Sequence, residues 1–313
     1  MNCSKFSWRL LVTQCKINLI LCNRHHRLKS TNAQTNLDYC VEIVKISDYE
    51  NYLGTLLLPK ETQRAAFAIR AFNVELAQVR DTVTERNIGL MKMKFWKDAL
   101  EQIYQPHLVP NTPVAVELAG ACRFFKLSKR WLNRVLEARI LHLECDNFST
   151  VKFVEEYAEN VNSSLYYVLL ECLGLKNVHA DHAASHLGKA QGLVTVLRST
   201  PYHASRRRVY IPMDILAKHK VSQEDIARGK SAQPVKDAVF EIASIANQHL
   251  EKARSLKSSL PPRTNLVFLN ASVCDHYLKS LQKVDFNIFD GKLQQRNPLL
   301  AYRMFVNKLK GHF

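Results

Sequence analysis

Apolar residues recur along this chain mainly at helical spacing, and the strict alternation typical of strands is nearly absent. Between Gln63 and about Val83, five apolar side chains form one face of an expected helix: Ala66, Ile69, Phe72, Leu76 and Val79. Further helices are expected over residues 95–104, 114–126, 129–144, 151–174, 180–200, 234–260, 270–284 and 299–309. The pattern therefore predicts an all-α fold.

Proline and capping residues set several of the expected helix ends. Pro201 should end the helix that begins near Ala180, because proline lacks a backbone N–H group and clashes with the preceding turn. Arg208–Pro212 should then form a short extended segment. Ser222 and Asp225 have the spacing of a capping box. Since no repeat or flexible linker is visible, we expect one helical domain over residues 38–313.

The first 37 residues differ from the rest in charge. They contain six cationic residues and no acidic residue, and the first acid is Asp38. A basic, acid-free N-terminus of this kind is typical of a mitochondrial transit peptide, which we predict over residues 1–37. A basic disordered tail is the alternative, whereas a secretory signal fits less well because Lys16 interrupts the apolar run.

Composition narrows the class of protein. The 313 residues are 47% apolar and 23% charged, as in ordinary globular proteins, but the net charge is +16. Without the six N-terminal cations the charge is still about +10, which indicates an acidic partner or an anionic membrane. The eight cysteines form no Cys-x-x-Cys pair, and no glycine-rich phosphate loop, nucleic-acid-binding motif or membrane-spanning apolar stretch is present. We therefore expect no cofactor, no metal site and no nucleic-acid partner.

One long segment combines many cations with no acid. From His182 to Met213 there is no Asp or Glu, although this stretch contains Lys189, Arg198 and Arg206–Arg208. Mg²⁺ prefers carboxylate oxygen ligands. The segment can therefore hold an anion directly but cannot supply a magnesium ion for that purpose.

Three stretches resemble the squalene/phytoene synthase family of head-to-head prenyl transferases. The most specific is Gly188–Pro212, GKAQGLVTVLRSTPYHASRRRVYIP, which is similar to a family motif without a gap. Leu56–Phe72 resembles the family's opening, and the stretch that begins at Tyr157 resembles another of its helices. The resemblance implies a single-domain, isoprenoid-synthase-like helical bundle around a central cavity.

In active members of that family, two Asp-x-x-x-Asp pairs face each other and hold magnesium ions that bind the substrate diphosphate. The corresponding positions here are Ala77 and Asp81 for the first pair, and Ser199 and His203 for the second. Three of the four acids are therefore replaced, which implies that the family's chemistry is lost. Asp81 and Glu85 also stand four residues apart and form an alternative metal-binding pair, or simply part of a solvated helix surface.

The resemblance also implies that the basic half of a diphosphate site remains, formed by Arg198, Arg206, Arg207, Arg208 and Tyr210. These residues are candidates to bind a phosphate or a lipid headgroup. Two plainer interpretations stay open. Arg198 forms an ion pair with Asp81, or Arg206–Arg208 is a solvated surface patch.

A narrower resemblance is to the non-catalytic mitochondrial branch of the family, which includes an assembly factor for respiratory complex I. It rests on Asn73–Val83, His179–Gly192 and Val284–Asn297. It implies a matrix protein, peripheral on the inner membrane, that binds complex I subunits or assembly intermediates, with a client segment or a lipid in its cavity. The alternatives are a divergent magnesium-dependent prenyl transferase and an isoprenoid or lipid carrier.

Three weaker signals each have two interpretations. His179, His182 and His186 lie along one helix stripe, where a pair of them forms a zinc-ligand candidate or a set of polar surface histidines. Tyr166 and Tyr167 line an isoprenoid tunnel or pack in the core. The basic, amphipathic C-terminal stretch rests on an anionic membrane or docks on the domain.

Overall fold

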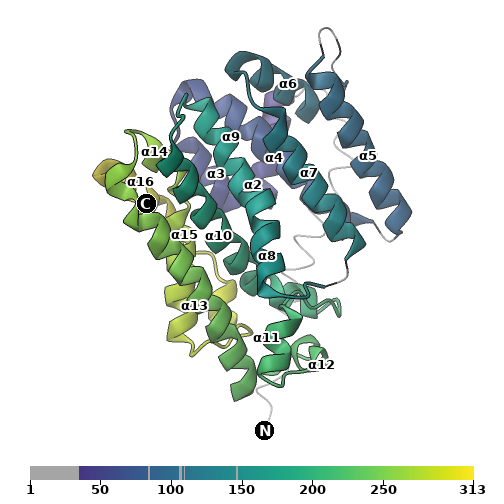
Figure 1. Ribbon diagram of the computed structural model, residues 1–313, viewed down its shortest axis with the longest axis vertical. Coiled ribbons are helices and arrows are strands. Elements are labelled where there is room, and N and C mark those ends of the chain that lie inside the picture. The colour runs from purple at the N-terminus through teal and green to yellow at the C-terminus, as the bar shows by residue number, and fades with distance from the viewer. Residues whose placement is uncertain (1–34, 84, 106–107, 109, 146) are drawn as a thin grey trace. The chain divides into compact units, whose positions relative to one another are not determined.

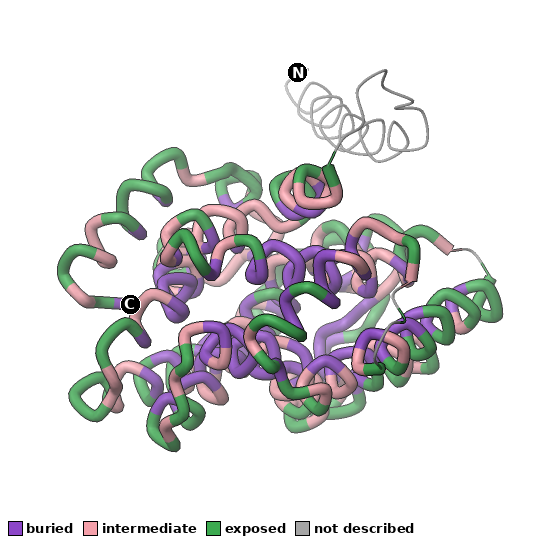
Figure 2. Tube along the Cα trace, turned by 90° about the horizontal axis from the view of Figure 1, so that it is seen from above, coloured by how far each residue is buried: buried purple, intermediate pink, exposed green. Residues whose placement is uncertain are grey.

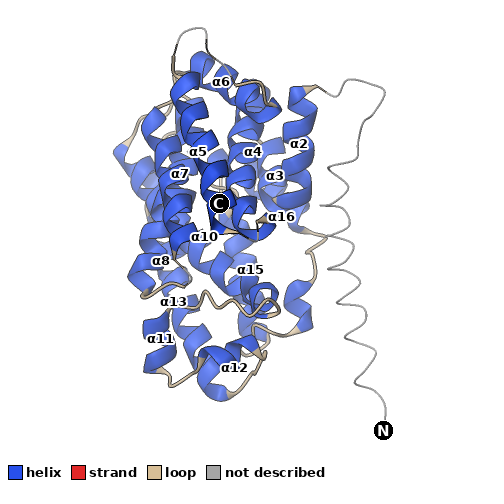
Figure 3. Cartoon of the chain, turned by 90° about the vertical axis from the view of Figure 1, so that its right-hand side faces the viewer, coloured by secondary structure: helices blue, strands red, loops and turns tan. Residues whose placement is uncertain are grey.

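The computed structural model describes residues 35–313 apart from 84, 106–107, 109 and 146. The expected transit peptide lies almost wholly outside the described residues, so it stays a prediction. Every regular element in the described residues is a helix (Figures 1 and 3), which confirms the all-α prediction.

The helices divide into an N-terminal and a C-terminal set. The N-terminal set comprises α2 (Asn36–Ser47), α3 (Tyr49–Leu56), α4 (Lys60–Thr82), α5 (Arg86–Ile103), α6 (Pro113–Phe125), α7 (Lys129–Glu144), α8 (Val151–Ala158), the π-helix η1 (Glu159–Ser163) and α9 (Ser164–Cys172). The C-terminal set comprises α10 (Val178–Ala204), α11 (Met213–Lys218), α12 (Gln223–Ala227), α13 (Gln233–Ser255), η2 (Lys257–Ser259), α14 (Thr264–Val267), α15 (Ala271–Lys283), η3 (Gly291–Gln294) and α16 (Leu300–Lys310).

Helix α4 lies at the centre of the first set, and α10 links the second set to the first. α4 packs against α2, α6 and α9, while α10 packs against α8, η1 and α13. The five residues expected to form the apolar face of α4 are all buried. Buried residues lie inside the helix layers and exposed ones on their outer faces (Figure 2), so a single apolar core connects most of the helices.

The helix expected over 151–174 contains a π-helical turn that the sequence pattern did not predict. This turn lies against two glycines of α10, Gly188 and Gly192. A Cβ atom at Gly188 would lie 2.5 Å from the backbone nitrogen of Ser163 and also clash with its hydroxyl group. A Cβ atom at Gly192 would clash with Ala158. The two glycines therefore allow the backbones of α10 and the π-helical turn to approach closely.

Several helix ends differ from the sequence prediction. Pro201 does not end α10, which continues for one more turn, and the Ser205 N–H donates to the Pro201 carbonyl at 3.2 Å. The cost of proline is limited there because it lies in the last turn, where few backbone bonds follow it. Arg208–Pro212 was predicted to be a short extended segment, and no helix covers these residues before α11 begins at Met213. The capping box at Ser222 and Asp225 is present.

Candidate functional site

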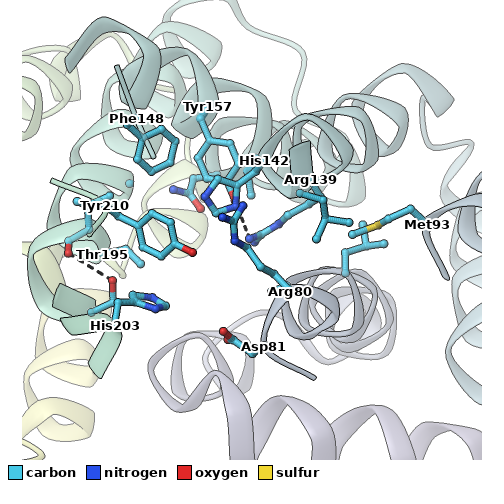
Figure 4. Close-up of a pocket in the computed structure, with 18 residues that line it drawn as sticks. Arg80, Asp81, Met93, Arg139, His142, Phe148, Tyr157, Thr195, His203 and Tyr210 are labelled. Atoms are coloured by element: carbon cyan, nitrogen blue, oxygen red, sulfur yellow. Dashed lines mark hydrogen bonds between the residues drawn. The ribbon is translucent and has the colours of Figure 1, made fainter. Parts of the chain in front are cut away.

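A cavity of about 190 Å³ lies among α4, α5, α7, η1 and α10 (Figure 4). Ala77 and Asp81 line it from α4, where they stand one turn apart. Ser199 and His203 line it from α10, also one turn apart. Two pairs of positions that are separated by more than 100 residues in sequence thus meet at one cavity, as the sequence resemblance implies.

The charge in this cavity is strongly asymmetric. Among the described residues, the lining includes Arg80 and Arg139 and one acidic residue, Asp81. Arg208 Nη1 lies 3.9 Å from the Asp81 carboxylate, so the charge of this acid is already partly balanced. Burial raises the pKa of Asp81, and the opposing effect of Arg208 does not cancel that shift.

Arg80 and Arg139 are held in place by neighbours of the cavity wall. Arg80 donates to the Cys145 carbonyl at 2.8 Å and lies 5.2 Å from the ring centre of Tyr210. Arg139 donates to the Tyr157 hydroxyl at 2.7 Å and to Asn73 Oδ1 at 3.1 Å. Both guanidinium groups are therefore held beside the cavity, and neither forms an ion pair with a carboxylate of the residues that the structure describes.

An aromatic cluster forms the wall opposite Asp81 (Figure 4). The imidazole of His142 stacks on Phe148, with ring centres 5.1 Å apart and an interplanar angle of 12°. Tyr210 contacts both His142 and His203, at centroid distances of 5.3 and 4.6 Å. Burial, together with the charges of nearby arginines, lowers the pKa of His142 to about 2 and that of His203 to about 4. Both imidazoles are therefore neutral at pH 7.

Four buried polar atoms at this cavity have no hydrogen-bond partner among the described residues. They belong to side chains from α7, from α10 and from the segment after α10: Arg139 Nε, His142 Nε2, His203 Nδ1 and Tyr210 Oη. Unpaired buried polar groups are uncommon and costly, and several of them at one place call for an explanation. Arg139 Nε and the Tyr210 hydroxyl are donors, each neutral imidazole donates through one of its two nitrogens, and Arg139 carries positive charge, so the set suits an anion.

The predicted arginines lie in three different environments. Arg198 donates to Glu50 Oε1 at 2.8 Å, so the expected pairing with Asp81 is wrong. Arg206 stacks over Tyr202, with its Cζ atom 3.7 Å from the ring centre, and like Arg207 it is exposed. Arg208 is half-buried and reaches Asp81. The solvated-patch interpretation therefore holds for the first two arginines of the run and fails for the third.

The alternative metal pair does not have the geometry it needs. Helix α4 ends at Thr82, and Glu85 has extended backbone angles as the N-cap residue of α5. Asp81 and Glu85 therefore do not lie one turn apart on a helix, and Glu85 is not part of the cavity lining. Among residues 35–313, outside the few undescribed positions, no group of three or more His, Cys, Asp or Glu side chains is arranged to hold a metal ion.

The histidine stripe and the tyrosine pair also have defined neighbours. His186 Nδ1 lies 2.8 Å from His249 Nδ1 on α13, and His249 Nε2 lies 2.8 Å from Glu155. His186 thus has its closest polar partner on another helix, although its ring also contacts that of His182. Tyr166 and Tyr167 are buried and bonded to Gln191 and Glu159, so they pack in the core.

Sequence reasoning missed three residues that shape the cavity: Arg80, Arg139 and His142. Arg80 directly precedes Asp81 and lies three residues after Ala77, so its position on the cavity face of α4 was readable from helical spacing. Arg139 and His142 have the same spacing on α7, but no motif marks that helix. Only the fold brings α7 beside the two motif helices.

Comparison with known proteins identifies the family. The squalene/phytoene synthase model matches residues 44–303, which is most of the chain. The chain belongs to the squalene/phytoene synthase family. Its fold agrees with this: a dehydrosqualene synthase structure superposes with a TM-score of 0.75 at 19% identity, covering 88% of this chain and 96% of the other. A squalene synthase from Alicyclobacillus acidocaldarius gives a TM-score of 0.71 at 16% identity, covering 80% and 95%.

Much more similar relatives carry a different kind of name. A human protein named NADH dehydrogenase (ubiquinone) complex I, assembly factor 6 is 49% identical over 268 residues, which is 86% of this chain and 80% of that protein. Its Drosophila melanogaster homolog is 42% identical over 281 residues, 88% and 84% of the two chains. A phytoene synthase from Arthrospira platensis is only 24% identical over 192 residues, 57% and 62% of the two chains.

The magnesium ions implied by the catalytic resemblance do not fit this cavity. Alanine and serine at positions 77 and 199 supply no carboxylate, and the neutral imidazole of His203 is a poor ligand for Mg²⁺. The remaining acid, Asp81, already interacts with Arg208. Three of the four positions that the resemblance implies for magnesium binding therefore carry no carboxylate.

Proposed function

We propose that the protein is a non-catalytic mitochondrial assembly factor for respiratory complex I. The observation that carries the proposal is the high identity, over most of both chains, to proteins that bear this name. In the proposed role, the protein works at the matrix side of the inner membrane and binds complex I subunits or assembly intermediates. Its import would depend on the predicted presequence.

The proposed loss of catalysis rests on the carboxylate count. Ionisation of a prenyl diphosphate leaves a highly charged diphosphate group, and metal ions are the usual means to stabilise it. Three of the four acidic positions lack a carboxylate, and the fourth lies beside an arginine. The loss of acids and the retention of arginines both favour binding over chemistry.

We propose further that the cavity binds a phosphate-type anion without a metal. Arg139, His142, His203 and Tyr210 each have a buried polar atom that lacks a partner, and Arg80 and Arg208 add positive charge nearby. The rest of the lining includes apolar side chains such as Met93 and Phe148, which suit a hydrocarbon chain. A lipid phosphate or an acidic client segment both present this chemistry.

The assembly role is tested by removing the protein from cells and resolving respiratory complexes on native gels. Complex I should fall while the other complexes remain, and unchanged complex I would refute the role. Re-expression of the Asp81→Asn variant in the cells that lack the protein distinguishes the assembly-factor hypothesis from the hypothesis of a divergent prenyl transferase. The variant should restore complex I fully, because no metal-dependent step requires that carboxylate.

The anion site is tested by calorimetric titration of the purified protein with inorganic pyrophosphate in EDTA. Binding should persist without divalent metal and should weaken about tenfold in Arg208→Gln, as expected for loss of one charge-assisted contact. Arg207→Gln is the matched control, because this neighbouring arginine is exposed, whereas Arg208 is half-buried and lies 3.9 Å from Asp81 in the cavity wall. Binding that requires Mg²⁺, or equal losses in both variants, would contradict the proposal.

The carrier alternative predicts a bound lipid. Native mass spectrometry of the protein purified from cells measures this directly. A co-purified phospholipid or isoprenoid phosphate that is lost in Arg208→Gln would assign the anion to a lipid headgroup. Competition of pyrophosphate binding by an acidic client peptide would assign it to a protein segment.

A further inference from the structure

Helix α16 presents an apolar face to solvent in addition to the face that docks it. The docked side inserts Leu300 and Met304 beside Leu269. Asn307 Nδ2 donates to Ser272 Oγ at 2.8 Å, and Lys308 Nζ donates to the Leu57 carbonyl at 2.9 Å. The helix is therefore held on the domain by one side alone.

The opposite side carries large apolar residues that contact little of the protein. Leu299, Tyr302, Phe305 and Leu309 are exposed by 56, 67, 47 and 70%. At 100° per residue, these four fall within about 120° of the helix circumference, centred opposite Leu300 and Met304. Single exposed apolar residues are normal on protein surfaces, but a continuous stripe marks an interaction surface.

The concentration of such residues is local. Of the 15 exposed large apolar side chains in the described residues, four lie in the 11 positions from 299 to 309. Figure 1 shows α16 at the edge of the bundle, close to the C-terminus, and the helix that it packs against is α15. The stripe is thus open to a partner and is not part of the wall of the proposed anion cavity.

The charge around this stripe selects an anionic partner. From residue 291 to the C-terminus there is no Asp or Glu, whereas five cations are present: Lys292, Arg296, Arg303, Lys308 and Lys310. Arg303 and Lys310 flank the stripe on one side of the helix and are exposed. An aromatic and aliphatic stripe bordered by Lys and Arg is the pattern of a helix that lies in a membrane interface.

We propose that α16 is a membrane-docking helix that rests its Leu299–Leu309 stripe on an anionic phospholipid bilayer. This inference deepens the proposed function, because it supplies the contact by which the protein would stay at the inner membrane. No helix in the described part of the chain is long and apolar enough to span a bilayer. A single helix of this length binds weakly through its apolar stripe alone, so the flanking cations contribute the rest.

The test is flotation of the purified full-length chain with phosphatidylcholine vesicles that contain 30% phosphatidylglycerol, across a range of lipid concentrations. Tyr302→Gln/Leu309→Gln should raise the half-binding lipid concentration at least tenfold, since each removes an inserted side chain. Arg303→Gln/Lys310→Gln should raise it by about fivefold per charge and reduce its salt dependence. Thermal unfolding should change little in either, because the four side chains are exposed and the one contact that Arg303 makes with His276, at 3.2 Å, lies at the surface.

The matched control is Phe124→Gln/Val178→Gln, which removes two apolar side chains exposed by 77 and 80% on other helices. It should float like the wild type. Residues 1–37 are identical in all arms, so ratios between variants report α16 alone. Absence of vesicle binding by the wild type, or equal losses in the control and α16 variants, would overturn the inference. Neither result bears on the knock-out test, so failure of the docking helix and failure of the assembly role are distinguishable.

Discussion

Two tyrosines of the cavity differ in one respect that can be measured. The Tyr157 hydroxyl accepts a hydrogen bond from Arg139 Nη1 at 2.7 Å, whereas the Tyr210 hydroxyl has no partner among the described residues although its side chain is only 5% exposed. Replacing each by phenylalanine removes the same atom from the same cavity. The two variants should therefore change stability in opposite or clearly unequal ways.

The expected magnitudes follow from the bonding of each hydroxyl group. Tyr157→Phe removes a bond to a charged group and should cost about 1.5–3 kcal/mol. Tyr210→Phe removes a buried group with no partner, so it should be neutral or stabilise the protein by up to about 1 kcal/mol. For a domain of this size, 1 kcal/mol corresponds to roughly 2–4 °C in Tm, so the melting temperatures of the two variants should differ by at least about 3 °C.

The same substitution should have the reverse effect on ligand binding. If the Tyr210 hydroxyl serves the proposed anion, Tyr210→Phe should weaken pyrophosphate binding by about tenfold or more, as expected for a charge-assisted hydrogen bond. Differential scanning calorimetry gives the stability and titration in EDTA gives the affinity. A Tyr210→Phe protein that is destabilised as much as Tyr157→Phe would refute the reasoning, because it would mean that the hydroxyl already has a partner in the folded protein.

Three further predictions concern packing, pH and specificity. Gly188→Ala should destabilise the protein by about 1–3 kcal/mol in urea unfolding, because its Cβ would clash with the backbone of Ser163. The control is Gly120→Ala, whose Cβ meets nothing within 4 Å and which should stabilise the helix by about 0.5–1 kcal/mol. Equal effects of the two substitutions would contradict the close contact. The melting temperature of His142→Phe should fall less than that of the wild type between pH 7.5 and 5. In the unfolded chain the histidine takes up a proton near pH 6.5, whereas in the native protein its pKa is lowered to about 2 and it stays neutral, so acid favours unfolding only when His142 is present. Parallel curves of Tm against pH would argue against a buried neutral imidazole. Sulfate, whose charge does not change in this range, should bind more tightly to the wild type as pH falls from 7.5 to 5.5. A bound anion beside His203 raises the pKa of that imidazole, so that binding takes up a proton. His203→Gln should flatten this pH dependence, and an unchanged slope in that variant would exclude His203 as the group that takes up the proton.

Most helices were predictable because their cause is local. The apolar face of α4 and the capping box of α12 depend on residues within one or two turns. The π-helical turn was not predictable, because its close contact is with two glycines of α10 some 25 residues later. Helices α2 and α3 were also missed, and their partners α4 and α6 lie further along the chain.

The candidate site was predictable only where a motif existed. The four replaced or retained acid positions were correctly placed around one cavity, since the resemblance fixes their register. The interpretation that Arg198 pairs with Asp81 was wrong. Its actual partner, Glu50, lies 148 residues away, and no spacing rule connects the two. Arg139 and His142 were missed for the same reason: their role depends on the packing of α7 against α4 and α10, which periodicity does not reveal.

The two helices that carry the motifs, α4 and α10, depart from the family's Asp-x-x-x-Asp pattern in different ways. On α4 the position of the first acid holds alanine, which adds space, and the second acid remains beside Arg208. On α10 serine and a neutral histidine replace both acids, so that side adds hydrogen-bonding groups without negative charge. Arg80 and Arg139 are half-buried and donate to neutral oxygen acceptors, but one nitrogen of Arg139 and one polar atom each of His142, His203 and Tyr210 are buried without a partner among the described residues, which costs stability. In the proposed anion site, a bound ligand would give these atoms hydrogen-bond partners and would supply the negative charge that the replaced acids no longer provide.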